Sequence, residues 1–287
     1  MPLNINTNAA ASSASYHLSK NNAALQKSLT RLSSGSRITQ PADDAGGLAV
    51  SMKLSGTINR LSGVEKNIDN AISFLQVQDG VLESSGKILD RMAELKALSQ
   101  DVLKNDSDIA NYNAEFKNLQ VQLYQMSETT FNGVSLFATT NSSGSVTFNT
   151  AGSGNTVSIF TSATGEGGSI VSINKTALLA ALTIDATSGN VAVKKTFQDA
   201  ATSGTDQIRS FGSATVGDAF ELGDVSVAVF TQALQNVATL RAENGGSVSR
   251  LQFSKESAAA QKTNLEAANG RIMDVDIASE STRLAKY

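Results

Sequence analysis

The feature that most constrains this chain is an apolar residue that recurs every three, four or seven positions along much of its length. Between residues 54 and 95 the repeat passes through Leu54, Ile58, Leu61, Val64, Ile68, Ile72, Leu75, Leu82, Leu89, Met92 and Leu95. Spacing of this kind, sustained over several heptads, places an apolar stripe along one side of a long helix, and a second helix packs on such a stripe. The chain is therefore expected to fold around long helices.

Further helices are predicted on both sides of this stripe. Residues 9–32 and 109–126 repeat apolar residues at helical spacing, and the pattern returns from about residue 224 to the C-terminus. Asn244 and Asn269 interrupt this last pattern, and polar residues in such a seam fix the register of the packed helices.

Acidic residues precede each of the later helical patterns and are expected to cap them. We predict Asp43 or Asp44 as the N-cap of the long central helix, Asp108 as the N-cap of the next one and Asp224 as that of the C-terminal one.

The middle of the chain has a different pattern. Residues 139–223 are rich in Gly, Ser and Thr, and short β-branched or alternating runs occur at 145–148, 156–160, 169–173 and 190–193. A turn segment at 151–155 separates the first two runs, and residues 175–182 favour one short helix. These patterns predict a small β-rich insert with hairpins. The expected fold class is mainly α with a small β-rich insert: a long antiparallel coiled-coil-like helical shaft built from both chain ends, with a variable domain in the middle.

Residue types that carry chemistry are scarce among the 287 residues. The chain has no Cys and a single His, His17, so thiol catalysis, thiolate metal sites and multi-His sites are excluded. The acidic pairs at 43–44 and 274–276 lack the ligand spacing of a calcium-binding loop. We expect no enzymatic activity, no cofactor and no metal.

Charge and hydropathy exclude two classes of partner. A net charge of −3 gives no basic footprint for nucleic acid. No apolar stretch is long enough to span a bilayer, and the N-terminus lacks the basic and apolar regions of a cleaved signal peptide.

Five segments resemble, in order, the signatures of one protein family. They are Ile5–Asn8, Arg31–Ile38 (RLSSGSRI), Asp43–Ala49 (DDAGGLA), Phe131–Val134 (FNGV) and Ala267–Glu280 (AANGRIMDVDIASE). The chain resembles bacterial flagellin over about residues 1–138 and 224–287, whereas the insert resembles no known domain. Flagellins of this kind continue beyond Leu284–Tyr287, so the chain is expected to lack the C-terminal end of the inner-core helix, and deliberate truncation is our hypothesis for this.

The resemblance implies a division into domains. Residues 1–43 correspond to an N-terminal inner-core helix, and residues 276–287 to the start of the truncated C-terminal one. Residues 44–138 and 224–275 correspond to the helical shaft, and residues 139–223 to a variable, surface-exposed β-rich domain.

The resemblance also implies a function. A flagellin is a structural subunit that polymerises into the flagellar filament for swimming motility. The implied partners are further copies of the chain, the flagellar export apparatus, an export chaperone and the hook-associated and cap proteins. The implied location is the extracellular flagellum, reached without a cleaved signal peptide.

Specific residues are expected to carry these roles. For packing between subunits we select the leucines of the first helix, which have no obvious partner, and for the shaft core we select the first half of the long stripe. The packing set is Leu18, Leu25, Leu29 and Leu32, and the core set is Leu54, Ile58, Leu61, Ile68 and Ile72.

A second implied role is recognition by the innate immune receptor that senses flagellin. Residues 89–95 (LDRMAEL) are similar to the recognised patch and carry Arg91, Glu94 and Leu95 in their places, with Glu115 also matched. Leu119 stands where the recognised pattern has Arg. An ordinary surface ion pair between Arg91 and Glu94 is the simpler interpretation.

Other classes of protein stay open as alternatives. One is the hook–filament junction protein, a structural relative for which weaker terminal signatures are expected. Another is a secreted coiled-coil adhesin, which should carry a secretion signal or an anchor. A flagellin with a proteolytic insert would need an HExxH motif, and residues 139–223 contain no His.

Overall fold

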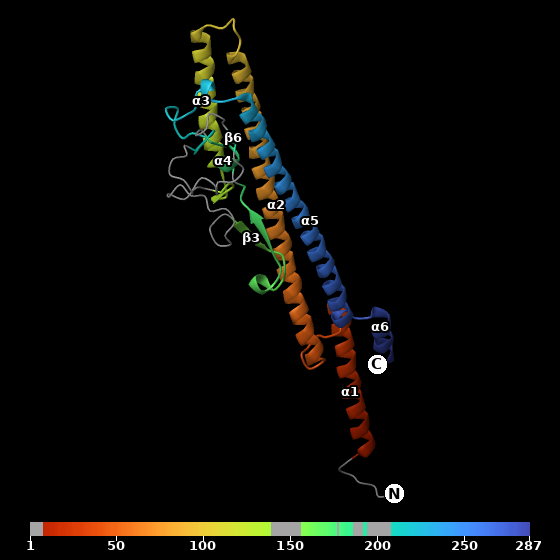
Figure 1. The fold of residues 1–287 in the computed structure, drawn as a ribbon. Helices are drawn as coiled ribbons and strands as arrows, with labels where there is room; N and C mark the ends of the chain where they lie inside the picture. The colour runs from red at the N-terminus through yellow and green to blue at the C-terminus, as the bar shows by residue number, and fades with distance from the viewer. Residues whose placement is uncertain (1–7, 139–155, 177, 186–191, 194–207) are drawn as a thin grey trace. The chain divides into compact units, whose positions relative to one another are not determined.

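The computed structural model describes residues 8–138, 156–176, 178–185, 192–193 and 208–287, which are mostly helical (Figure 1). The helices are α1 (Ala9–Ser34), α2 (Ala45–Ser99), α3 (Asp106–Ser127), α4 (Leu178–Ala181), α5 (Val227–Met273) and α6 (Ile277–Lys286). The chain forms two compact units. Unit 1 comprises Met1–Gly63 and Ser257–Tyr287, and unit 2 comprises Val64–Glu256. The predicted mainly helical fold with helical regions at both chain ends is confirmed.

Residues at the helix ends explain where α1 and α2 begin and stop. The Asn8 side chain accepts hydrogen bonds from the N–H groups of Ala10 and Ala11 at the start of α1. Gly35, with φ of 68°, ends α1 in the left-handed conformation that glycine adopts most easily. Asp44 caps α2, because its carboxylate accepts a 2.8 Å hydrogen bond from the Gly47 N–H.

Two predicted caps were wrong. The N-cap of α3 is Asn105, and Asp108 occupies the third helical position and completes a reciprocal capping box with it. Asp224 ends a short 3₁₀ turn, Leu222–Asp224, where its carboxylate accepts a 3.3 Å hydrogen bond from the Glu221 N–H, and α5 begins three residues later. In both cases the predicted residue is of a type that caps helices, but the turn geometry places it a few positions away from the N-cap.

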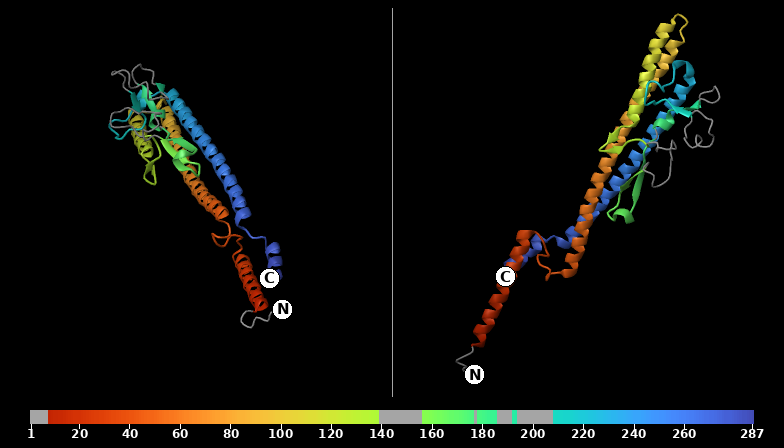
Figure 2. Two further views of the ribbon diagram at one scale, coloured as in Figure 1. Left: turned by 90° about the horizontal axis from the view of Figure 1, so that it is seen from below. Right: turned by 90° about the vertical axis from the view of Figure 1, so that its left-hand side faces the viewer.

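Unit 2 is built on an antiparallel pair made by α2 and α5, which lie side by side (Figure 2). The predicted stripe of α2 is its core, and the fully buried side chains include Ile68, Leu75, Leu82, Leu89, Met92 and Leu95. The Asn244 amide of α5 donates a 2.8 Å hydrogen bond to the Leu75 carbonyl. Arg241 forms a bidentate pair with Asp79, with N–O distances of 2.9 and 3.0 Å. The order of these contacts along the two helices fixes their antiparallel register.

Buried amide side chains join the connecting segments to the helices of unit 2. Gln78 on α2 donates to the Leu136 carbonyl at 2.6 Å, and Gln120 on α3 donates to and accepts from the Phe220 backbone, both at 2.9 Å. Asn236 on α5 donates to the Ala181 carbonyl at 3.1 Å. Each amide satisfies a buried backbone group that no regular ladder reaches.

The strands form small antiparallel pairings within unit 2. They are β1 (Thr130–Phe131) with β2 (Val134–Ser135), β3 (Thr156–Phe160) with β4 (Ile170–Asn174), and β5 (Thr183–Asp185) between β6 (Ala192–Val193) and β7 (Ile208–Ser210). Asn132 and Gly133 have φ of 50° and 78°, which both central residues of the tight β1–β2 turn require.

The insert agrees with its prediction where it is described. The run at 156–160 is β3, the run at 169–173 is β4 shifted by one residue, and the short helix is reduced to α4. The run at 145–148, the turn at 151–155 and the first half of the run at 190–193 lie outside the described residues. Among the described residues, the predicted runs at 156–160 and 169–173 therefore pair with each other as the β3–β4 hairpin.

The packed stripe leads to a stability prediction. Leu82→Ala should lower the free energy of unfolding by about 2–5 kcal/mol, because the side chain is fully buried and its removal leaves a cavity. Thermal and denaturant unfolding followed by circular dichroism measure the change. Val77→Ala is the matched control on the exposed side of α2, and its effect should stay below about 0.5 kcal/mol. Equal effects of the two substitutions would contradict the assignment of the core.

Candidate functional site

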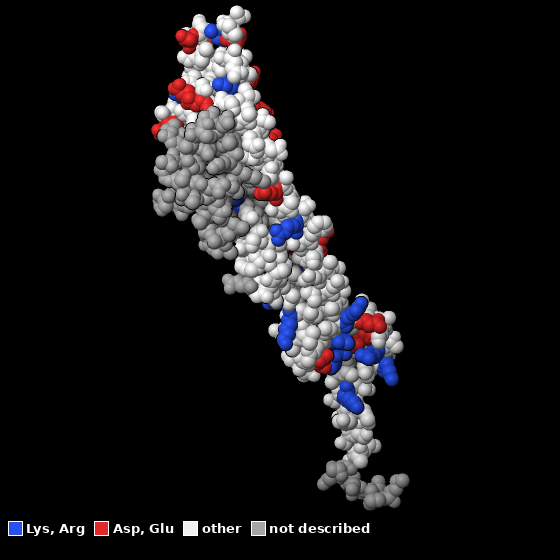
Figure 3. Space-filling view, viewed as in Figure 1, with Lys and Arg blue, Asp and Glu red and all other residues white. Residues whose placement is uncertain are grey.

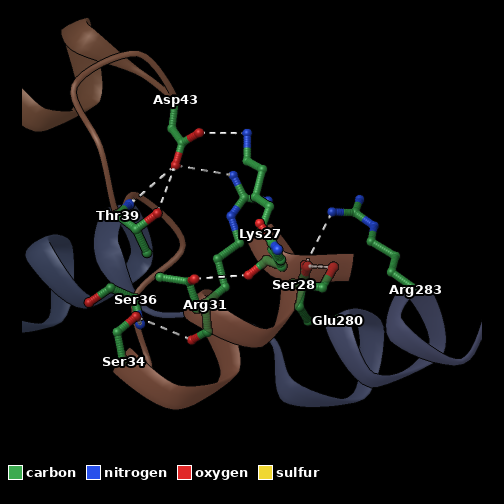
Figure 4. A network of polar contacts seen from close by, with 11 residues as sticks. Lys27, Ser28, Arg31, Ser34, Ser36, Thr39, Asp43, Glu280 and Arg283 are labelled. Carbon is green, nitrogen blue, oxygen red and sulfur yellow. Dashed lines mark hydrogen bonds and ion pairs between the residues drawn. The ribbon is translucent and has the colours of Figure 1, made fainter. Parts of the chain in front are cut away.

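The candidate assembly site lies in unit 1, where the two ends of the chain pack on each other as α1 and α6. The Ser28 hydroxyl of α1 donates a 2.7 Å hydrogen bond to the Glu280 carboxylate of α6, and both residues are buried (Figure 4). Arg283 pairs with the other carboxylate oxygen of Glu280 at 3.3 Å. Glu280 is therefore buried with both carboxylate oxygens engaged, which is the condition for placing a charge in an interior.

Backbone hydrogen bonds join the loop after α1 to the segment between α5 and α6. The Arg37 N–H donates to the Met273 carbonyl at 2.6 Å, and the Val275 N–H donates to the Gly35 carbonyl at 3.0 Å. Ser36 and Asp274 form an isolated antiparallel bridge between them. The two signature segments of the sequence, 31–38 and 267–280, are thus brought into direct contact.

Asp43 anchors the same loop to α1. Its carboxylate lies 2.5 Å from the Lys27 ammonium and 3.7 Å from the Arg31 guanidinium, and it accepts hydrogen bonds from the Thr39 N–H and hydroxyl at 3.3 and 3.1 Å (Figure 4). The hydrogen bond from Lys27, together with those from Thr39, holds the pKa of this carboxyl well below its usual range. The predicted role of Asp43 as a cap missed this network, because it joins residues from two different elements.

The four predicted packing leucines lie along one face of α1, within about 60° at 100° per residue. Leu18 and Leu29 are 66% and 48% exposed, and Leu25 and Leu32 are half-buried. Tyr16, which was not among the predicted packing residues, is also 66% exposed, but at 100° per residue it lies on the opposite side of α1. A helix that leaves such a row uncovered has an unpartnered apolar face.

The predicted shaft-core residues divide between the units. In unit 1, Leu61 is fully buried and Leu54 and Ile58 are half-buried; in unit 2, Ile68 is fully buried and Ile72 is half-buried. A polar contact accompanies the unit 1 residues: the Ser51 hydroxyl donates to the Asn269 side-chain oxygen at 2.7 Å.

The predicted receptor patch forms an exposed ion-pair cluster in unit 2. Arg91 on α2 donates to Glu115 on α3 at 2.8 and 3.3 Å, and to Glu94 on its own helix at 2.7 Å. These carboxylates, Glu115 first, raise the pKa of the Arg91 guanidinium. Leu95 is fully buried, so its side chain is excluded from a surface contact. Leu95 belongs to the apolar repeat of residues 54–95, so the sequence already indicated that its side chain is buried.

The surface carries little other chemistry. Lys and Arg side chains gather around α6 in unit 1 (Figure 3). Within the described ranges, no group of three or more His, Cys, Asp and Glu is placed to hold a metal ion. In that same part of the chain, none of the helices combines the length and the apolar content needed to cross a bilayer.

Comparison with known proteins gives a consistent set of relatives. The family model of the bacterial flagellin N-terminal helical region matches residues 5–142, and that of the C-terminal helical region matches residues 227–287. Flagellin of Bacillus subtilis (strain 168) is 31% identical over 289 aligned residues, covering 99% of this chain and 91% of that protein. The flagellar filament 30.7 kDa core protein of Treponema maltophilum is 29% identical, covering 96% of this chain and 88% of that protein. The crystal structure of Bacillus cereus flagellin is 20% identical with a TM-score of 0.45, covering 71% of this chain and 94% of that one.

The lowered pKa of Asp43 leads to a pH prediction. A carboxylate whose pKa is depressed by folding stabilises the fold above its ordinary pKa of about 4, and this contribution is lost as the pH falls below that value. Asp43→Asn should lower the unfolding temperature at pH 7, and the difference from the unsubstituted protein should shrink on acidification to about pH 2. Asp90→Asn, at an exposed position of α2, is the control and should leave the profile unchanged. A difference that persists at low pH would contradict this role.

Proposed function

The chain belongs to the bacterial flagellin family and is a structural subunit of the flagellar filament; we propose that it polymerises through its two terminal segments into the filament with which the bacterium swims. The observation that carries this proposal is the partly exposed leucine row of α1, which ends with Leu29 and Leu32 beside the Ser28–Glu280 contact. In a filament this row packs against the terminal helices of neighbouring copies.

The geometry of unit 1 suits this role. The network around Asp43 and the Glu280 contact hold α1, its following loop and α6 in one arrangement before assembly. A preformed surface loses less conformational entropy when it binds. Apolar area buried at the contact contributes about 25 cal/mol per Å². The proposed contact joins different surfaces of successive copies, and an assembly of this kind grows as a helix when the rotation between copies does not close a ring.

The domain division follows from the same proposal. Residues 1–43 and 276–287 form the inner core of the filament, residues 44–138 and 224–275 form the shaft, and residues 139–223 form the variable domain on the outer surface. The antiparallel α2–α5 pair, and the Asn236 and Gln120 amides that hold Ala181 and Phe220 of the insert, support a rigid shaft with a tethered outer domain.

Export and capping complete the proposed pathway. The subunit leaves the cell through the flagellar export apparatus with the help of a chaperone and assembles between the hook-associated and cap proteins. A chain without Cys and with few aromatic residues has few groups that would hinder passage in an unfolded state. The extracellular filament is its destination.

A second proposed role is binding to the flagellin-sensing innate immune receptor. The supporting observation is the Arg91 cluster, which fixes one guanidinium and two carboxylates from α2 and α3 on an exposed surface. With Leu95 buried, the contact would consist of Arg91, Glu94 and Glu115. The paired charges are pre-organised, so a partner that matches them loses little side-chain entropy.

The leucine row gives the test of polymerisation. Leu25→Asp combined with Leu29→Asp in the complete protein should abolish filaments seen by electron microscopy, because assembly would then bury two carboxylates without partners. Helicity should be retained, because both side chains are partly exposed already. Ala23→Asp combined with Thr30→Asp adds the same charge on the other side of α1 and serves as the control. Normal filaments from the leucine variant would refute the proposed packing face.

The Arg91 cluster gives the test of receptor binding. Arg91→Ala should lower the response of receptor-expressing reporter cells at least tenfold, whereas Lys87→Ala, which removes an exposed pair with Glu83 one turn away, should leave it unchanged. No response to the unsubstituted protein at high nanomolar concentration would end this proposal and leave the filament role intact.

A further inference from the structure

The sequence contains three Asn–Gly pairs, and the structure places them in two different environments. Asn132–Gly133 forms the tight turn between β1 and β2, whereas Asn244–Gly245 and Asn269–Gly270 lie inside α5. In such a pair the side-chain amide carbon of Asn is close to the main-chain nitrogen of the next residue, and glycine has no Cβ to hinder an approach between them. The three pairs share this chemistry, so the fold determines which of them reacts.

The turn leaves both reacting groups of the first pair open. Phe131 and Val134 are the last paired residues of the β1–β2 ladder, so Asn132 and Gly133 lie beyond it, and both are exposed. Among the residues that the structure describes, no hydrogen-bond partner engages the Asn132 side chain or the Gly133 N–H. Beyond the chain neighbours, no described atom lies within 4 Å of the position that a Cβ on Gly133 would take. The Gly133 nitrogen is therefore accessible.

The helix protects the other two pairs. Inside α5, the main-chain nitrogen after each Asn donates its hydrogen bond to the carbonyl four residues earlier. The Asn244 side chain is buried, and its amide donates to the Leu75 carbonyl at 2.8 Å. The Asn269 side chain accepts a hydrogen bond from the Ser51 hydroxyl at 2.7 Å. Reaction at either pair requires α5 to open locally, and such opening costs free energy in a packed helix.

We propose that Asn132 is a site of spontaneous deamidation in the folded protein and that the other two pairs are protected. The Gly133 nitrogen attacks the Cγ atom of Asn132, and the N–Cγ bond forms. The Cγ–Nδ2 bond breaks, and the amino group leaves as ammonia with the proton of the Gly133 N–H. One solvent water then opens the five-membered imide: cleavage of the N–Cγ bond gives aspartate, and cleavage at the main-chain carbonyl carbon gives isoaspartate. One water is consumed and one ammonia is released, with no oxidant or reductant.

The modification changes the charge of a defined surface. Asn132 lines an apolar groove of about 290 Å³ between α2, the β1–β2 turn and the β3–β4 hairpin, and none of the residues that line it is charged. Phe74 and Phe131 meet edge to face in this groove, with ring centroids 6.0 Å apart. Either product places a carboxylate at the groove. Isoaspartate also adds one methylene to the main chain of a turn whose length sets the register of β1 and β2.

Peptide mass spectrometry of the full chain tests this site, and the two pairs in α5 serve as controls within the same molecule. The folded protein is incubated at mildly alkaline pH and then digested at acidic pH, where ring closure is slow. The peptide with Asn132 should gain about 1 Da, or about 3 Da in oxygen-18 water, as one amide becomes a carboxyl. This gain should be at least about tenfold faster than in the peptides with Asn244 and Asn269, because those sites react only after local opening.

The same chain unfolded in guanidinium chloride shows whether the fold causes the difference. Without structure, the three pairs should deamidate at rates within about threefold of one another, because the protection of α5 is gone. The Asn132→Asp variant supplies the standard for the aspartate product, and a protein isoaspartyl methyltransferase labels the isoaspartate.

Two outcomes would overturn the proposal. One is a folded protein in which Asn132 reacts no faster than Asn244 and Asn269. The other is an unfolded chain that keeps the tenfold difference, since the neighbouring sequence and not the turn would then cause it. Because the reaction takes place in the free chain, its failure leaves the proposed polymerisation untouched.

Discussion

The structure of unit 2 depends on the burial of one apolar row along α2 against α5 and the elements beside it. Leu82, Leu89 and Met92 have no exposed surface, and their burial is the largest favourable contribution that such a seam offers. Apolar burial has no direction, however, and a repeat of three, four and seven residues offers nearly the same burial after a slip of one heptad. The register of two long helices must therefore come from contacts that do have direction.

Polar side chains in the seam provide that direction. Asn244 reaches the Leu75 carbonyl and Arg241 grips Asp79 in unit 2, and Asn269 pairs with Ser51 in unit 1. The side-chain oxygen of Asn244 is buried without a hydrogen-bond partner, a defect that costs about 1–3 kcal/mol. We interpret this cost as the consequence of fixing register, because in a slipped seam Asn244 would no longer reach the Leu75 carbonyl.

Much of the helical fold could be predicted from the sequence, because periodicity reports directly on which side of a helix is buried. Contacts between distant segments left no such signal. Ser28 and Glu280 lie 252 residues apart, and neither belongs to an apolar pattern. Asp43 was predicted as a cap because, like Asp44, it precedes the helical pattern, and only the folded loop brings Lys27 and Thr39 to it. The insert was predicted by residue type alone, so its strand pairing depended on turns that composition does not specify.

The same physics applies to the surface that the folded chain leaves exposed. The exposed ion pairs, such as Lys255–Asp69, contribute little to stability, since water screens them. Strong attraction between copies must then come from apolar surface. The exposed apolar side chains of the described residues include Leu18 and Leu29 of α1 and Val102 and Leu103 of the loop between α2 and α3. Exposed apolar groups at such sites are an aggregation liability for a solitary protein. In a filament subunit, a contact between different surfaces of successive copies leaves one surface of each added copy free for the next one.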